Sequence, residues 1–172
     1  MINMVSYNGN GVRTLVRASM IAALYAGLTL ALSPVSYGPV QFRISELLTV
    51  LPAISAPSVW GLAAGCFIAN IFSPYGWVDM LFGTCATLSA ALLSRLFRGV
   101  TFKGVPLLSF LMPVICNAVI IGAEITLFTE GADLLLFGWS ALTVGLGEAA
   151  VCYGAGVPFW LLITKTKLKR FI

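Results

Sequence analysis

The 172-residue sequence contains no histidine, and only 9% of its residues are charged. A soluble domain carries about 25% charged residues, and a small soluble domain must leave a large share of its residues facing water. Because 59% of the residues are hydrophobic, the composition excludes an ordinary soluble domain and predicts an integral membrane protein. The absence of histidine also removes the commonest general base and metal ligand, and we predict no metal or other cofactor.

Several motifs are missing as well. The sequence has no G-x-x-x-x-G-K-[ST] phosphate-binding loop, so energy from ATP would have to come from partner chains. It has no C-x-x-C pair, and we interpret the cysteines as small buried apolar residues; they are Cys66, Cys85, Cys116 and Cys152. The first hydrophobic segment is too long and too uniformly rich in alanine for a cleavable signal peptide.

Hydrophobic runs predict an all-α membrane protein of six transmembrane helices that form a single domain over residues 1–172. The predicted helices cover residues 12–32, 43–54, 58–72, 77–97, 105–128 and 133–164. A helix needs about 20 residues to cross the hydrocarbon core. The second and third are short for this, and the alternative is one helical hairpin that does not fully cross. Glycines and Pro158 could bend the sixth.

The basic residues predict the orientation. If both termini are cytoplasmic, one side of the membrane receives nine of the ten lysines and arginines, as the positive-inside rule requires. These nine are Arg13, Arg17, Arg95, Arg98, Lys103, Lys165, Lys167, Lys169 and Arg170. We therefore predict a multi-pass protein of the cell membrane with both termini in the cytoplasm. Four tryptophans are interpreted as anchors at the lipid interface; they are Trp60, Trp77, Trp139 and Trp160.

Polar residues inside the predicted helices all fall at mid-depth or in the outer half of the membrane. They are Glu46, Asn70, Asp79, Asn117, Glu124 and Glu148. A carboxylate at mid-bilayer costs about 2.5–3.5 kcal/mol, so such groups face a cavity or have a partner. Arg43 is the only basic residue on this side and can pair with one or two of the acids. The surplus of carboxylates predicts a ligand that is cationic or rich in N–H donors.

Each of these residues also has a structural interpretation, which stays open here. Glu124 and Glu148 could be protonated or could bond across helices. Glu46 lies three residues after Arg43 on one helix face and could pair with it locally. Asp79 could cap the fourth helix or act as a first-turn acid. The two asparagines fit packing and ligand contact equally well.

Two further features suggest contacts. Ala18, Ala22 and Ala26 recur every four residues and form a face that another helix could approach closely; packing inside the bundle is the alternative. The loop 33–42 carries Tyr37 and Phe42 and could close as a lid over a planar ligand, or simply connect two helices.

Together these features resemble the substrate-binding S components of energy-coupling factor (ECF) transporters, and within them the QueT family. The specific part is the run Gly38-Pro39-Val40-Gln41-Phe42-Arg43-Ile44-Ser45-Glu46-Leu47-Leu48-Thr49-Val50-Leu51-Pro52. Shorter matching stretches cover residues 65–70, 79–84, 113–118 and 145–149. The resemblance implies an S-component-like bundle that captures a micronutrient at the outer face. It also implies docking, through the Ala18, Ala22 and Ala26 face, on a membrane T component and two cytoplasmic ATPases.

The substrate that this resemblance implies is a queuosine precursor, a 7-deazaguanine such as its 7-aminomethyl form. Glu148 or Glu124 could accept the paired N–H donors of the guanine-like edge, and a second carboxylate could pair with the ammonium group. Asn70 or Asn117 could recognise the ring carbonyl, while Tyr37 or Phe42 could stack on the ring. No nucleic acid is expected as a partner.

Other functions remain as alternatives. The chain could be an S component for a different vitamin or nucleobase-like micronutrient, or a stand-alone small transporter. Against the latter, we find no internal symmetry between two halves. A membrane enzyme could use aspartate and glutamate as acid and base. It would do so without histidine, a G-x-S-x-G nucleophile elbow or a cluster of metal ligands, so we predict that the protein is not an enzyme.

Overall fold

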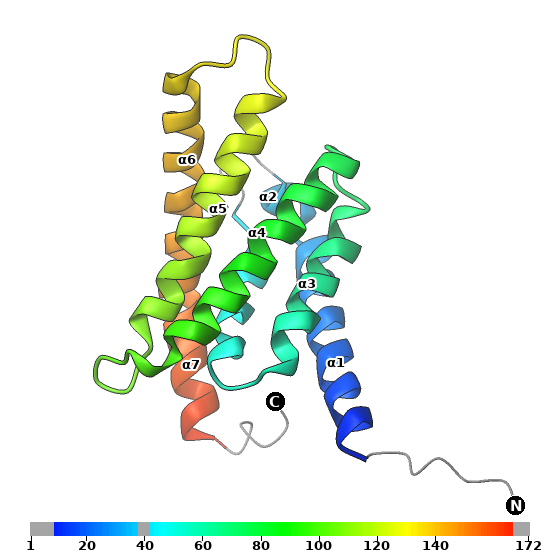
Figure 1. Cartoon of the computed structure of the whole chain (residues 1–172), viewed down its shortest axis with the longest axis vertical. Helices are drawn as coiled ribbons and strands as arrows, with labels where there is room; N and C mark the ends of the chain where they lie inside the picture. Colours follow the sequence, from blue (N-terminus) through cyan, green and yellow to red (C-terminus); the bar gives the residue numbers. More distant parts are fainter. Residues whose placement is uncertain (1–8, 38–41, 167–172) are drawn as a thin grey trace, which may run out of the picture.

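The computed structural model describes residues 9–37 and 42–166, and all of its regular elements in these ranges are helical. The longer helices are α1 (Gly9–Ala31), α3 (Pro57–Asn70), α4 (Trp77–Leu96), α5 (Leu107–Leu127), α6 (Leu134–Ala149) and α7 (Gly156–Lys165). Shorter elements are α2 (Ser33–Ser36), the 3₁₀ helices η1 (Ile44–Ala53) and η2 (Phe97–Gly99), and the π-helical segment η3 (Ala150–Ala155). Figure 1 shows these elements as one elongated bundle.

All six predicted segments are helical, but the count of six membrane spans is not confirmed. Four stretches are long and apolar enough to cross a membrane: Gly11–Ala31, Trp77–Gly99, Leu107–Leu127 and Leu134–Lys165. The ten residues of η1 extend about 20 Å at the 3₁₀ rise. The 14 residues of α3 extend about 21 Å at the α-helical rise. Each is shorter than a hydrocarbon core of about 30 Å.

The segments nevertheless alternate in direction (Figure 1). The first described residue of α1 and the last of α7 lie at one end of the bundle, the lower end of the view. α1, α3 and α5 run away from this end, whereas η1, α4 and the α6–α7 stretch run back toward it. The loop after α5, with the exposed Glu130 and Asp133, lies at the opposite end. The described chain thus has the up-and-down arrangement that the sequence predicts.

The 3₁₀ helix η1 lies at the centre of the bundle and contacts α1, α3, α4, α5, α7 and η3. Its Leu48 and Leu51 belong to the main hydrophobic core, with Tyr25 of α1 and Leu62 of α3. Pro52 lies inside the segment and cannot donate the backbone hydrogen bond of a continuing helix. The Pro52 carbonyl instead accepts a hydrogen bond from Nη1 of Arg95 at 3.2 Å, which ties the end of η1 to α4.

The last helical stretch is interrupted rather than bent sharply. The sequence predicts one segment with several glycines available for bending. In the structure α6 passes into α7 through η3, one π-helical segment. A π-segment widens the turn and is frequent at functional sites. Gly156 follows it, and a Cβ atom there would lie 2.9 Å from the Phe110 ring, so glycine permits the close approach of α7 to α5.

Aromatic and aliphatic side chains cover the outside of the bundle, as expected for a surface that contacts lipid. Trp60, Trp77 and Trp139 are each exposed by 60% or more, which fits the predicted interface anchors. The prediction is wrong for Trp160, which is buried. Its indole Nε1 donates to the carbonyl of Gly104 at 3.1 Å, so this residue fastens the loop before α5 to α7.

Candidate substrate-binding site

A buried ion pair joins the start of η1 to the start of α4. Arg43 has an extended backbone and directly precedes η1, while Asp79 lies in the first turn of α4. Nη2 of Arg43 is 3.5 Å from Oδ2 of Asp79, and the two side chains are only 2% and 0% exposed. The hydroxyl group of Ser73 also donates to Asp79 Oδ2. Asp79 is therefore both a first-turn acid and the partner of the arginine.

Asn70 at the end of α3 contacts this pair from the neighbouring helix. Its Nδ2 donates to the backbone carbonyl of Asp79 at 2.8 Å and to Sγ of Cys66 at 3.4 Å. Gly83, one turn after Asp79, leaves room for the amide, because a Cβ atom there would lie 2.4 Å from Asn70 Nδ2. The side chain of Asn70 is thus held in one orientation by α4.

Glu46 of η1 is completely buried and is bound from two sides. Its Oε1 accepts hydrogen bonds from the hydroxyl of Tyr25 and from Oγ1 of Thr87, the latter at 3.3 Å. Thr87 also lies 3.2 Å from Sγ of Cys66, which links Glu46 to Asn70. We call these buried polar residues around Arg43 the Arg43 cluster. Helices α1, α3 and α4 therefore all contribute groups that fix the start of η1.

The other side of the cluster comes from α5, α6 and η3. The carboxyl group of Glu124 on α5 is close enough to interact with Asp79 and Arg43. Glu148 on α6 interacts with Glu46 and Arg43, and its Oε2 lies 3.9 Å from Sγ of Cys152 in η3. The bundle therefore brings together acids that are more than 100 positions apart in the sequence.

Arg43 lies among four buried carboxyl groups and contacts one of them directly. It pairs with Asp79 and interacts electrostatically with the other three, which are Glu46, Glu124 and Glu148. One guanidinium group cannot neutralise four carboxylates, and removing an ion from water is costly unless it has a partner. The described residues thus bring four buried acidic side chains together with one buried arginine.

Several polar atoms of this cluster have no hydrogen-bond partner within the described residues. The unsatisfied acceptors are Glu46 Oε2, Asn70 Oδ1, Asp79 Oδ1 and Glu124 Oε2, and the unsatisfied donors include Arg43 Nε and Asn117 Nδ2. Buried polar groups are normally hydrogen-bonded. Arg43 Nη2 is a further unsatisfied donor. The four open acceptor atoms suit a ligand that carries several N–H donors.

The structure describes the positions of the two aromatic residues that were predicted to stack on a ligand. Tyr37 is buried; its hydroxyl donates to the Ala69 carbonyl at 2.7 Å, and the guanidinium carbon of Arg43 lies 5.6 Å from its ring centroid. Beside Tyr37, a hollow of about 330 Å³ is lined also by Ser33, Pro34, Phe72 and Pro74. Phe42 is half-buried, and residues 38–41 of the predicted lid lie outside the described residues.

The alanine face lies against α3. Ala22 and Ala26 are each 7% exposed, and a Cβ atom on Gly65 of α3 would lie 2.7 Å from the carbonyl oxygen of Ala22. Packing within the bundle therefore occupies much of this face. Ala18, Ala22 and Ala26 also line a groove of about 460 Å³ between α1 and α3, with the exposed Trp60 and Ile68 at its border.

Sequence reasoning missed Tyr25, Thr87, Cys66 and Cys152 as members of the cluster. Helical spacing was the available signal, since Cys66 precedes Asn70 by four residues and Cys152 follows Glu148 by four, on the same helix faces. Cys66 is buried but contacts polar groups. The cysteine prediction is wrong for Cys85, which is exposed. No group of three or more possible metal ligands is found in the described part of the chain.

The sequence is similar to known transporters. The profile of the family described as "QueT transporter" matches residues 15–165. The chain is 40% identical over 76 residues to a protein of Lactococcus lactis subsp. cremoris (strain MG1363) named "Queuosine precursor transporter QueT". That match covers 43% of this chain and 44% of the relative, less than half of each. No solved structure matches. Since the family profile covers most of the sequence, the chain belongs to the QueT transporter family.

Proposed function

We propose that the protein captures a queuosine precursor of the 7-deazaguanine class, such as its 7-aminomethyl form, within the Arg43 cluster. The name of the Lactococcus lactis relative indicates a queuosine precursor. The single observation that carries the proposal is the excess of buried carboxyl groups around one arginine, with their open acceptor atoms. The ligand would supply the missing positive charge and N–H donors.

The chemistry of such a ligand matches the cluster. A guanine-like edge presents adjacent N–H groups that one carboxylate can accept in a bidentate way, and an aminomethyl group is an ammonium ion at neutral pH. We assign the edge to Glu124 or Glu148, and the ammonium to a second carboxylate of the cluster. The free Oδ1 of Asn70 accepts N–H groups, whereas the free Nδ2 of Asn117 suits the ring carbonyl.

The aromatic residues fit a planar ligand. Tyr37 lies beside both Arg43 and the outer hollow, and Phe42 directly precedes Arg43 in the chain. Stacking on an aromatic ring binds any flat base with little discrimination between bases. In this assignment Tyr37 or Phe42 covers the ring, and the carboxylates and asparagines provide the specificity.

The energy source is assigned to partner chains. We propose that the chain is the S component of an ECF importer that docks on a membrane T component and two cytoplasmic ATPases, with both of its termini in the cytoplasm. Two observations support this: the sequence has no phosphate-binding loop of its own, and the Ala18–Ala22–Ala26 row borders a groove between α1 and α3. Copurification with these subunits would test the assembly. Uptake by cells that express this chain alone would instead favour a stand-alone transporter.

Calorimetry with purified protein and 7-aminomethyl-7-deazaguanine tests ligand binding. Glu124→Gln and Glu148→Gln are expected to weaken binding by about 30-fold or more, because losing one member of a buried charge pair costs 2–5 kcal/mol. Glu130→Gln is the matched control, since Glu130 is exposed in the α5–α6 loop. If both cluster variants bind as tightly as the parent protein, the carboxylate assignment is wrong.

A further inference from the structure

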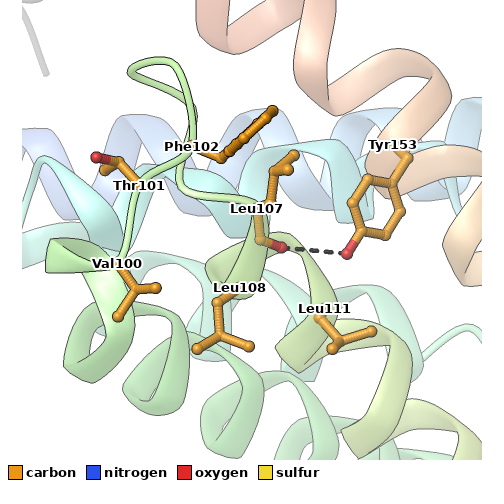
Figure 2. A pocket seen from close by; sticks show the side chains of 7 residues that line it. All are labelled: Val100, Thr101, Phe102, Leu107, Leu108, Leu111 and Tyr153. Atoms are coloured by element: carbon orange, nitrogen blue, oxygen red, sulfur yellow. Dashed lines mark hydrogen bonds between the residues drawn. The ribbon is translucent and has the colours of Figure 1, made fainter.

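A second site lies at the basic end of the bundle, away from the Arg43 cluster. A cleft of about 470 Å³ lies between the loop that follows η2, the first turns of α5, and Tyr153 of η3. Figure 2 shows the side chains that line it. Phe102, Leu108 and Leu111 give it apolar walls. Its volume is within the range of roughly 300–1,000 Å³ that is usual for small-molecule pockets.

The loop that borders the cleft has a defined conformation. Phe102 and Val105 exchange two backbone hydrogen bonds of 2.8 and 3.0 Å, and Lys103 and Gly104 between them have positive φ angles of 50° and 80°. Trp160 holds the tip through the Gly104 carbonyl. On the opposite wall, the Tyr153 hydroxyl donates to the Leu107 carbonyl at 3.1 Å (Figure 2). Hydrogen bonds thus join the loop to α7 and join η3 to the start of α5 on the two sides of the cleft.

Two basic residues lie in the loop that borders the cleft and in the short helix η2 before it. Nζ of Lys103 lies 5.5 Å from the centroid of the Phe102 ring, so the ammonium group stands beside the apolar wall. Arg98 is exposed in η2, which immediately precedes the loop. All six acidic residues of the chain lie elsewhere: Glu46, Asp79, Glu124, Glu130, Asp133 and Glu148. None of the described residues that line the cleft is acidic.

We propose that the cleft binds an acidic phospholipid. Its acyl chain would lie along the apolar wall formed by Phe102, Leu108 and Leu111, with its headgroup beside Lys103 and Arg98. Exposed basic residues at a membrane surface attract anionic lipids, and the apolar walls account for burial of the chain. This site is independent of the proposed substrate site.

Fluorescence quenching tests the proposal in the full-length protein. A variant with Trp60→Phe, Trp77→Phe and Trp139→Phe keeps Trp160, beside the loop, as its single tryptophan. We reconstitute it with phosphatidylglycerol or phosphatidylcholine brominated on the acyl chains. Quenching is expected to reach half-saturation at a mole fraction of phosphatidylglycerol about fivefold lower than of phosphatidylcholine.

Further variants distinguish lipid binding in the cleft from general attraction of anionic lipid to the basic surface. Lys103→Gln or Arg98→Gln should reduce the preference for phosphatidylglycerol, whereas Lys165→Gln, which removes a cation from the same end of the bundle, should preserve it. Leu108→Phe should fill the cleft and weaken quenching by both lipids. Equal quenching by the two lipids, or an equal effect of Lys165→Gln, would overturn the proposal. Loss of quenching as protein concentration rises would assign the cleft to a second copy instead.

Discussion

Arg43 shows how one buried cation can organise a membrane site. Its charge is nearly inaccessible to solvent, and the desolvation cost is repaid only by well-placed partners. Asp79 provides the direct ion pair, and three further carboxyl groups lie within interaction range. Several acidic groups can therefore offset the charge of Arg43, whereas Asp79 pairs with a single cation among the described residues.

This difference predicts unequal effects of removing the two partners. Arg43→Gln leaves four buried carboxyl groups without a cation and should reduce the free energy of unfolding by about 3–5 kcal/mol. Asp79→Asn should cost less, because Arg43 retains Glu46, Glu124 and Glu148 nearby. Unfolding of the ligand-free protein in mixed detergent micelles measures both values. A larger loss for Asp79→Asn than for Arg43→Gln would contradict this account of the pair.

The position of the Asn70 amide depends on the absence of a side chain at Gly83. Gly83 lies four residues after Asp79, so it lies on the same face of α4. A methyl group there would come 2.4 Å from the Asn70 amide, which itself bonds to the Asp79 carbonyl.

We therefore expect Gly83→Ala to displace Asn70 and weaken ligand binding about tenfold, the equivalent of 1.4 kcal/mol. Calorimetry with 7-aminomethyl-7-deazaguanine provides the measurement. Gly138→Ala is the control, because a Cβ atom at Gly138 meets nothing within 4 Å. Unchanged affinity in Gly83→Ala would show that the position of Asn70 does not matter for the ligand.

At the scale of elements, α1 and α3 approach so closely that backbone meets backbone. Hypothetical Cβ atoms on Gly61 and Gly65 would lie 2.6 and 2.7 Å from the carbonyl oxygens of Ala18 and Ala22. Small residues on both helices therefore form this contact, as is common where van der Waals packing drives association in lipid.

The contact predicts a sharp difference between two glycines. Gly65→Ala should destabilise the protein by about 1–3 kcal/mol, the usual cost of overpacking. Gly27→Ala on α1 should be neutral or slightly stabilising, because a Cβ atom there meets nothing within 4 Å and alanine favours helix. Thermal unfolding in detergent compares them. Equal melting temperatures for the two variants would argue against this packing.

For the whole molecule, the charge distribution predicts which end faces the cytoplasm. The basic residues at the α1, α4–α5 and α7 ends share one end of the bundle, and the α5–α6 loop lies at the other (Figure 1). In a Cys85→Ser background, we expect a membrane-impermeant maleimide to label Glu130→Cys on intact cells. It should label Arg98→Cys only after lysis. The reverse pattern would invert the proposed topology.

The class of protein, the six helical segments and most members of the polar cluster could be predicted from composition and hydrophobic pattern alone. This was possible because the cost of burying polar atoms in lipid restricts both composition and periodicity. Arg43, Glu46, Asp79 and Glu148 could be found as isolated polar residues in apolar runs. Their gathering around one arginine agrees with the predicted surplus of acids, while their contacts with substrate remain a prediction.

The lengths of the helices and the partners of the buried polar side chains became clear from the three-dimensional structure. It showed η1 as a short 3₁₀ helix in the middle of the bundle, where contacts with the surrounding helices outweigh the local preference of its sequence. It also assigned Tyr25 and Thr87 to Glu46 and Trp160 to the loop before α5 rather than to the lipid interface. Such pairings join residues far apart in the chain, and they depend on how the helices pack, which periodicity within a single segment does not encode.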